Sequence, residues 1–366
     1  MIKGLKAFTL KMVAGANIAS ILIMLLAGYS GYLEPVNHSF LANIGLAFPV
    51  FLFVNFGFLV FWLIFKPKGV LIPLLGFMVC YQPVRAYIPF NVQSSVPDSA
   101  IKVLSFNVWV FNGRNEAGKP NPVLEYLQEQ KADIVCLQEA SPYGIRQETI
   151  DSVMGRLYEY SDTSCTNAGE DVLAVYSHFP IIHKEKIAYK SAGNHSAAFT
   201  LDIKGEDIVV INNHLETVGL SPEDKENFKT MIKGEVKRDR AEKESKRLAD
   251  KLGEATKIRA PQARAIAQFI RKHSYQSVIC VGDFNDGPLS YTHRTIADGL
   301  TDCYIATGNG PGISYHEGGF YVRIDNIMCS KDWKPYGCKV DTKIKASDHY
   351  PIYCWLKKTP KSLKNR

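Results

Sequence analysis

The 366-residue sequence predicts an α/β protein of the α+β type, in which a mixed β-sheet flanked by helices follows a group of membrane-spanning helices. Long apolar runs fill the first ninety residues. From residue 101 onward, β-branched runs alternate with helical patterns, which is typical of an α/β domain. Some neighbouring runs are too close together for a helical crossover, so we expect antiparallel as well as parallel strand pairs.

Three apolar segments in the first ninety residues approach or exceed the roughly 20 residues that a helix needs to cross a bilayer. They are Met12–Tyr29, Phe40–Phe65 and Gly69–Phe90. The second has no charged residue and no amphipathic period, which argues against a buried helix of a soluble domain. The third is interrupted by Gln82, Pro83 and Arg85. No convincing cleavage site follows the first, so we expect an uncleaved anchor and a membrane domain over residues 1–90 with three spans.

The positions of the lysines predict how the spans are oriented. Lysines precede the first span, and Lys66 and Lys68 follow the second, so both of these regions are expected in the cytoplasm. If the third segment crosses, the rest of the chain lies on the extracytoplasmic side of a multi-pass protein of the cell inner membrane. If it does not cross, the rest of the chain stays in the cytoplasm.

A polar, turn-rich linker at residues 91–100 leads into a body at residues 101–358, and a basic tail follows at residues 359–366. The expected strands are Lys102–Asn107, Asp133–Gln138, Val172–Ser177, Ala197–Ile203, Asp207–His214, Ser277–Gly282, Arg323–Cys329 and Pro351–Leu356. The expected helices are Pro122–Gln130, Glu148–Arg156 and Ala260–His273.

Residues 218–260 form an insertion that is dense in charges of both signs. Its apolar residues recur with a helical period, which predicts one or two amphipathic helices. A solvated helical excursion explains such a segment without any chemical role. The alternative is a lid, or a surface that meets lipid headgroups, because basic amphipathic helices can lie on membranes.

Six strand-like runs end in a carboxylate, an amide or an imidazole. They read LSFNV around Asn107, IVCLQEA around Glu139, VVINNHLE around His214, VICVGDFND around Asp283 and Asn285, RIDNIMC around Asp325, and SDHYPIYCW around Asp348 and His349. A buried strand that ends in such a group delivers it to a sheet edge. Hard oxygen ligands combined with two imidazoles suit metal-assisted attack on a phosphoester.

Each motif also has a simple structural explanation. Glu139 could cap a helix, His214 could be a buried structural histidine, and Asp325 could pair with Arg323. Asp and Asn also populate turns because of their own hydrogen bonding. All six together, in this order, nevertheless favour one polar site.

The net charge of +7 is concentrated at the two ends of the chain. Residues 1–99 carry +4 and the last ten residues carry +5, which leaves −2 for the body between them. Binding of duplex DNA usually requires a broad basic face. The slightly acidic body therefore argues against bulk duplex DNA as the substrate.

The ordered set SFN, QE, HL, GDFN, RID and SDH resembles the endonuclease/exonuclease/phosphatase superfamily, over roughly Ile101 to Leu356. That superfamily includes DNase-I-like nucleases, neutral sphingomyelinases and inositol polyphosphate 5-phosphatases. The resemblance implies a four-layer α/β sandwich of two mixed β-sheets flanked by helices. It also implies hydrolysis of a phosphoester with a divalent cation, usually Mg²⁺, with Mn²⁺ as a second possibility.

Roles carried over from the resemblance fall on eight residues. As implied metal ligands we carry over Asn107, Glu139 and Asp348. As implied catalytic residues we carry over His214, Asp283, Asn285, Asp325 and His349. Asp283 would orient or deprotonate the attacking water, and Asn285 would hold a non-bridging phosphate oxygen. His349, paired with Asp325, and His214 would stabilise charge on the phosphate, and His214 could instead protonate the leaving oxygen.

Two positions depart from the family pattern. Trp109 stands where nuclease branches often carry an acidic residue, so a second ligand from this strand is in doubt. Asn213 stands where many members have Thr before the histidine. Arg259 and Gln262 could also line the site, although Pro261 in the first turn of a helix explains that stretch without function.

Three hypotheses of function follow. The first is a membrane-anchored, metal-dependent phosphodiesterase or phosphatase, whose phosphoester substrate lies at or near the bilayer, such as a phospholipid headgroup. The second is an endonuclease or exonuclease that acts on small or single-stranded nucleic acid. The third is a non-catalytic membrane scaffold with the same fold, which the complete set of polar groups argues against.

Overall fold

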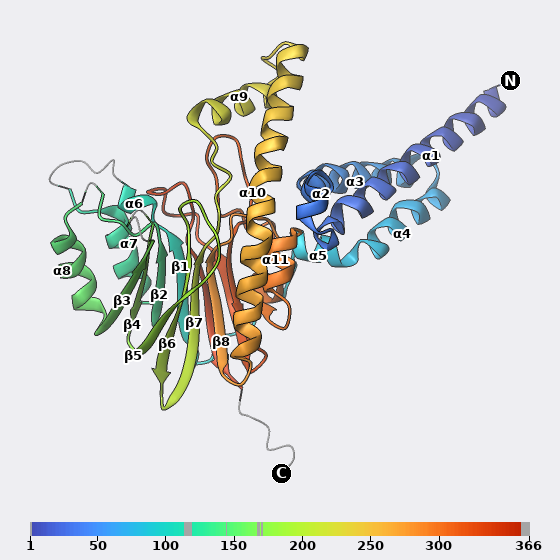
Figure 1. The fold of residues 1–366 in the computed structure, drawn as a ribbon. Coiled ribbons are helices and arrows are strands. Elements are labelled where there is room, and N and C mark those ends of the chain that lie inside the picture. Colours follow the sequence, from blue (N-terminus) through green and yellow to red (C-terminus); the bar gives the residue numbers. More distant parts are fainter. Residues whose placement is uncertain (1, 113–118, 144, 167–168, 170, 360–366) are drawn as a thin grey trace.

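The computed structural model describes residues 2–112, 119–143, 145–166, 169 and 171–359 (Figure 1). Within them, two six-stranded β-sheets pack face to face, helices cover the outer faces, and the N-terminal helices project from one side. This confirms the predicted four-layer sandwich of two mixed sheets. The predicted basic tail lies outside the described residues except for Thr359.

The first sheet has the strand order β11-β12-β1-β2-β4-β3. Its strands are β1 (Ile101–Asn107), β2 (Ile134–Gln138), β3 (Tyr160–Cys165), β4 (Val172–Ser177), β11 (Trp333–Val340) and β12 (Ile352–Lys358). Strands β1 and β2 pair in parallel, and the other described pairs are antiparallel. The parallel pair lies in the middle of the sheet, so both strands end at the same edge.

The second sheet has the strand order β5-β6-β7-β8-β10-β9. Its strands are β5 (Ile181–Ile187), β6 (Ser196–Ile203), β7 (Glu206–His214), β8 (Ser277–Asp283), β9 (Thr301–Asp302) and β10 (Asp325–Cys329). Here β7 and β8 form the central parallel pair, and the other described pairs are antiparallel. Between the two sheets lies the main core, which includes Val103, Phe199 and Ile279.

The four strands that the sequence pattern missed, β3, β5, β9 and β11, are the edge strands of the two sheets. Strand β5 reads IIHKEKI and is exposed along most of its length. Strand β11 contains Pro335 and Gly337 and has an irregular register. Edge strands carry polar residues, prolines and irregularities that blunt their unpaired side. A search for apolar, β-branched runs therefore finds the central strands alone.

Helices cover both outer faces. On the first sheet lie α7 (Pro122–Gln130) and α8 (Gln147–Leu157), and on the second lie α10 (Arg238–Lys272) and α11 (Tyr291–Ile296). Short helices α6 (Trp109–Asn112) and α12 (Cys303–Thr307) occupy loops. The insertion forms α9 (Pro222–Ile232) and the first half of α10.

Helix α10 corrects one expectation. We expected a helix to begin near Ala260, with Pro261 in its first turn, but α10 runs without interruption from Arg238 through Pro261. Proline removes one backbone donor and favours a kink. It does not end this helix, because the segments before and after Pro261 are both held by packing. Ile266 and Ile270 anchor the second half in the core of the second sheet, and the first half stands above that sheet (Figure 1).

The N-terminal region is helical and largely apolar, with long helices and short connecting ones. They are α1 (Ile2–Gly28), η1 (Ser30–Tyr32), α2 (Pro35–Ala42), η2 (Asn43–Ala47), α3 (Phe48–Phe65), η3 (Pro67–Val70), α4 (Leu71–Val79) and α5 (Tyr81–Tyr87). Two helical stretches of the described chain, Gly4–Gly28 and Pro35–Phe65, are long and apolar enough to cross a membrane. The third candidate is bent by 69° between α4 and α5, so it counts only if the bent pair is one span.

These helices pack against the helices that cover the second sheet. Helix α2 packs on α10 (Figure 1), and η1 packs on α11. The guanidinium of Arg264 on α10 lies 2.8 Å from the carboxylate of Glu34. The hydroxyl of Thr256 donates to the Asn43 amide oxygen at 3.0 Å. The buried Arg323 donates to the carbonyl of Ala86, at the end of α5.

Candidate active site

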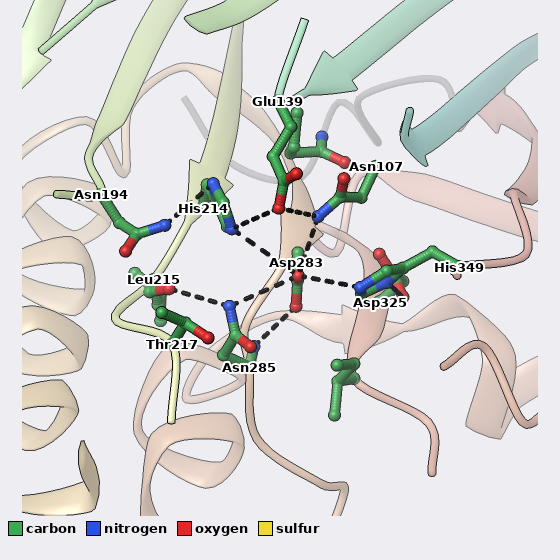
Figure 2. Close-up of polar contacts among 12 residues, drawn as sticks. Asn107, Glu139, Asn194, His214, Leu215, Thr217, Asp283, Asn285, Asp325 and His349 are labelled. Atoms are coloured by element: carbon green, nitrogen blue, oxygen red, sulfur yellow. Dashed lines mark hydrogen bonds and ion pairs between the residues drawn. The ribbon is translucent and has the colours of Figure 1, made fainter. Parts of the chain in front are cut away.

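The strand register brings the predicted residues of the second sheet together. Asp283 ends β8, and its register partners are His214 on β7 and Asp325 on β10. In the first sheet, Asn107 lies opposite Gln138, the residue before Glu139. Figure 2 shows these side chains converging from the ends of the two sheets.

A glycine makes this convergence possible. Gly282 has a φ of +124°, and a Cβ at this position would lie 2.1 Å from the carbonyl oxygen of Asn213. Any other residue would push β7 and β8 apart, so only glycine fits. Glu139 and Asn285 both have a φ of 51°. Such left-handed conformations in residues with a side chain often occur at functional sites.

Two carboxylates converge on the amide of Asn107. Its Nδ2 lies 3.0 Å from Glu139 Oε1 and 3.3 Å from Asp283 Oδ2. Carboxylate and amide oxygens are the ligands that Mg²⁺ prefers, so this donor set fits a hard divalent cation. The amide oxygen of Asn107 accepts from the Trp109 N–H at 3.1 Å, so the amide has to turn over before that oxygen faces the carboxylates.

The third predicted ligand, Asp348, lies on the loop before β12. That loop is tied to the first strand, because the Ser347 hydroxyl donates to the Asn107 carbonyl at 2.7 Å. A different group of described residues, Asp283, Asp325 and His349, has potential ligand atoms that all lie within 4.8 Å of one another. The imidazole of His349 is an unsuitable ligand while it holds a proton on each nitrogen.

Each histidine of the site has its own carboxylate. Nδ1 of His349 lies 2.8 Å from Asp325, and Nδ1 of His214 lies 2.8 Å from Asp171. Burial alone lowers the pKa of each imidazole, but the facing carboxylates outweigh it and raise the pKa of His214 to about 9 and that of His349 to about 10. Both rings are therefore cationic at neutral pH, with Nε2 directed toward Asp283.

Asp171 is a site residue that the sequence did not reveal. Burial raises the pKa of this carboxyl, but the opposing effect of His214 and His195 is larger, and the pKa is lowered to about 2. One carboxylate oxygen faces His214, and the other lies 2.9 Å from His195 Nδ1. Asp171 precedes β4 in a polar loop and does not follow an apolar strand, so no motif marked it.

Asp283 occupies the centre of the site. Its Oδ2 lies 3.6 Å from His349 Nε2 and 3.9 Å from His214 Nε2. Burial and the neighbouring Asp325 raise the pKa of Asp283 to about 6, although the two histidines lower it. The second oxygen of Asp325, Oδ1, is buried and has no hydrogen-bond partner among the described residues.

Asn285 is held beside Asp283. Its backbone N–H donates to Asp283 Oδ1 at 2.8 Å, and its amide nitrogen donates to the Leu215 carbonyl at 2.9 Å (Figure 2). Behind this turn, Arg259 lies 3.4 Å from Asp286 and donates to the Glu216 carbonyl. Arg259 therefore reaches the site, as we expected that it could.

One cavity of about 380 Å³ joins these groups. Six of the eight predicted residues line it: Glu139, His214, Asp283, Asn285, Asp348 and His349. The other two, Asn107 and Asp325, are buried behind them. The insertion contributes Lys225 and Leu252 to the same wall. It therefore takes part in the site and is more than a solvated excursion.

Residues 104–349 match the sequence profile of the endonuclease/exonuclease/phosphatase family. The chain belongs to this family. Residues 10–87 match a second profile, described as a domain of unknown function, DUF8431. The search of curated proteins gave no match. Membership in the family supports a phosphoesterase fold with a buried Asp/His site that could hold a metal ion.

Solved structures with the same fold include the human Nocturnin catalytic domain with bound sulfate. It is 17% identical with a TM-score of 0.52, and the match covers 73% of this chain and 96% of that chain. The D. rerio TDP2 complex with a single-strand DNA product is 17% identical with a TM-score of 0.51, and the match covers 71% of this chain and 100% of that chain. At this identity the likeness concerns the fold.

Proposed function

We propose that this family member is a membrane-anchored, divalent-metal-dependent hydrolase of phosphoester bonds, a phosphodiesterase or phosphatase, in which water attacks phosphorus. One observation carries the proposal: Asp283 lies between two imidazoles and faces Glu139 across the amide of Asn107. Such a site can hold a phosphoryl group, activate a water and balance the charge of the transition state.

The proposed metal ligands are Asn107, Glu139 and Asp348. A magnesium ion bound there, or manganese in its place, would neutralise the negative charge that grows on the phosphoryl oxygens. Asp283 orients the attacking water and accepts its proton. A pKa of about 6 keeps this carboxylate ionised at neutral pH while leaving it basic enough to accept a proton.

The two imidazoles act on the phosphate from opposite sides. Asp325 and Asp171 each accept a hydrogen bond from the Nδ1–H of their histidine, which fixes the ring and leaves the Nε2–H directed into the cavity. His349 and His214 thus stabilise negative charge, and His214 is placed to protonate the leaving oxygen. Asn285 holds a non-bridging oxygen.

The anchor follows from the apolar N-terminal helices. We assign residues 1–90 to the membrane domain, 91–100 to the linker and 101–358 to the catalytic domain. With the bent pair α4–α5 counted as a span, the lysine positions place the catalytic domain on the extracytoplasmic side. A reporter fused after Arg366 tests this placement, and a cytoplasmic signal from it would reverse the assignment.

The activity is tested with the full chain in lipid nanodiscs. The substrates are bis(4-nitrophenyl) phosphate, sphingomyelin and phosphoinositide vesicles, a plasmid and an oligonucleotide. We expect turnover that requires Mg²⁺, stops with a chelator and is lost in Asp283→Asn. If no substrate were turned over with Mg²⁺ or Mn²⁺, the non-catalytic scaffold would replace this proposal.

A nuclease is the second candidate. The observation that favours it is the shared fold with TDP2, which was solved with a single-strand DNA product. The slightly acidic body argues against duplex DNA. Turnover of the oligonucleotide in the same panel, without turnover of the lipid vesicles, would favour the nuclease.

A further inference from the structure

The catalytic cavity has a second wall that the reaction does not use. Besides the carboxylates and imidazoles, aliphatic and aromatic side chains from separate parts of the chain line the same cavity. These are Leu46, Leu220, Leu252, Phe320, Val322 and Ile324. Leu46 belongs to η2, between two apolar N-terminal helices, and Leu252 belongs to the insertion part of α10. We call these six residues the apolar wall.

The hollow continues from this wall toward the membrane helices. A neighbouring cavity of about 150 Å³ shares Asn43, Leu46 and Val322 with the catalytic cavity and reaches Pro49 at the start of α3. On α3, the next exposed apolar side chains are Val50, 59% exposed, and Phe53, 77% exposed. Two adjoining cavities, each lined in part by apolar side chains, therefore lie between the catalytic groups and a helical stretch that is long and apolar enough to cross a bilayer.

Contacts between elements of the chain hold these side chains in place. The Thr256–Asn43 hydrogen bond and the Arg264–Glu34 ion pair hold α2 and η2 on α10. The rings of Phe228 and Phe320 stack at 4.1 Å, which joins α9 to the loop that carries Phe320. The position of Leu46 relative to Asp283 is thus set by the docking of the N-terminal helices.

The charges around the cavity disfavour a polyanion as its occupant. Four carboxylates line it, Glu139, Asp283, Asp286 and Asp348, against two imidazoles and two lysine or arginine side chains, so the lining has no excess of positive charge. Of the two lysine and arginine side chains that line it, Arg259 is engaged by Asp286 and the Glu216 carbonyl. Lys225 lies 5.5 Å from the centre of the Tyr315 ring. A single phosphoryl group attached to a hydrocarbon suits these walls better than a nucleic acid strand does.

We propose that the apolar wall is a binding subsite for the hydrocarbon chain of an amphiphilic phosphoester, which enters from the bilayer along η2 and α3 while its phosphoryl group meets Asp283. This inference rests on the proposed hydrolase, since it assigns the substrate class of the same site. Removing hydrocarbon from water into such a wall stabilises the complex, by about fourfold in affinity for each methylene.

The experiment measures binding of methyl-, butyl- and octylphosphonate to the full chain in nanodiscs with Mg²⁺, by isothermal titration against empty nanodiscs. These probes share one head group, so the ratio of their dissociation constants reports the wall alone. We expect octylphosphonate to bind at least tenfold more tightly than butylphosphonate. In Leu46→Gln and Leu252→Gln the ratio falls toward one, while methylphosphonate binds as before.

The matched control is Leu41→Gln on α2, an exposed leucine outside both cavities. It keeps the wild-type ratio if the wall is the subsite. The subsite is overturned if octyl- and butylphosphonate bind equally, or if Leu41→Gln lowers the ratio as much as Leu46→Gln does.

Turnover of bis(4-nitrophenyl) phosphate, measured in parallel, separates the two proposals. Turnover with no dependence of binding on chain length would overturn the subsite and keep the hydrolase. Dependence on chain length, without metal-dependent turnover of any phosphoester in the panel, would overturn the hydrolase and keep an amphiphile-binding site.

Discussion

Two regions of this chain bury polar side chains, with opposite results. The helix cluster consists of Asn17, Ser20, Asn55 and Trp62, and it joins α1 to α3. The catalytic cluster consists of Asn107, Glu139, His214, Asp283, Asp325 and His349. The first is uncharged, whereas the second combines three carboxylates with two cationic imidazoles.

In the helix cluster, donors and acceptors are matched. Asn17 donates to the Asn55 amide oxygen at 2.9 Å and accepts from the Trp62 indole at 3.0 Å. Asn55 donates to the Ser20 hydroxyl at 2.9 Å and to the Phe51 carbonyl at 2.8 Å. Because an unpaired polar group inside a membrane helix is costly, a matched network stabilises one packing of the two helices.

In the catalytic cluster, His349 is paired with Asp325, but other groups are not fully matched. Glu139 and Asp283 both face the amide of Asn107, and Asp325 keeps a buried oxygen without a partner among the described residues. A buried network that is uncharged and fully paired stabilises the fold. A charged network with unpaired groups is free to bind a phosphoryl group and a cation, at a cost to stability.

The largest expected effect comes from the centre of the catalytic cluster. Asp283→Asn removes the proposed base, so we expect kcat/KM on bis(4-nitrophenyl) phosphate to fall by about 10³-fold or more. The same change removes a buried negative charge that faces Asp325, so the midpoint of thermal unfolding without metal should stay the same or rise. A fall in both quantities would assign a structural role to Asp283.

The next largest effect concerns Asp171. Asp171→Asn removes the charge that raises the pKa of His214, so this pKa should fall in an NMR titration. Turnover should drop by about 10- to 100-fold, which is typical when a group that orients an active-site histidine is removed. His195→Gln, on the other oxygen of the same carboxylate, is the control and should retain more turnover. Equal losses in the two variants would contradict this role of Asp171.

The helix cluster should respond in the opposite way. Asn55→Leu leaves Asn17 and Ser20 without their partner, which we expect to lower the free energy of unfolding by about 1–3 kcal/mol. Turnover per folded molecule should not change. Phe53→Leu on the same helix, at an exposed apolar position, serves as the control in thermal unfolding in detergent. A loss of turnover in Asn55→Leu without a loss of stability would contradict a purely structural role of the helix cluster.

The smallest effect is expected at a third buried pair, His293–Asp302, which is 2.8 Å apart and outside the catalytic cavity. Burial raises the pKa of Asp302, but the bond to His293 lowers it below its ordinary value. A lowered carboxyl pKa stabilises the fold above the unfolded pKa of about 4, and this contribution is lost as the pH falls through the folded pKa.

Asp302→Asn should therefore reduce stability at pH 7 and weaken its loss on acidification, with turnover unchanged. Unfolding in denaturant, followed between pH 3 and pH 7, checks this expectation. A drop in turnover at pH 7 would mean that a His–Asp pair outside the cavity also serves the reaction.

The sequence predicted the part of the site that lies at strand ends. Asn107, Glu139, His214 and Asp283 follow apolar runs, and two central parallel pairs bring such ends to one edge. Asp171 could not be found in this way, because it lies in the loop before a strand and contacts the site through His214. The edge strands also escaped, since half-exposed strands carry no continuous apolar run.

The sequence also did not predict the apolar wall, for another reason. Leu46 and Leu252 line one cavity because the N-terminal helices dock on α10, and contacts between segments so far apart in the sequence leave no pattern in either segment. Gln82, Pro83 and Arg85 indicated that the third candidate span was interrupted, but the sequence did not predict the 69° bend between α4 and α5.

The contact between Arg323 and the Ala86 carbonyl bears on how the enzyme is prepared. Arg323 is buried two residues before Asp325, with its guanidinium 4.6 Å from the centre of the Tyr304 ring. A fragment that lacks residues 1–90 would lose one acceptor of this guanidinium and, with Asn43 and Leu46, part of the cavity lining. The cavity of such a truncated fragment would therefore be incomplete, and substrate assays of the proposed hydrolase require the intact chain.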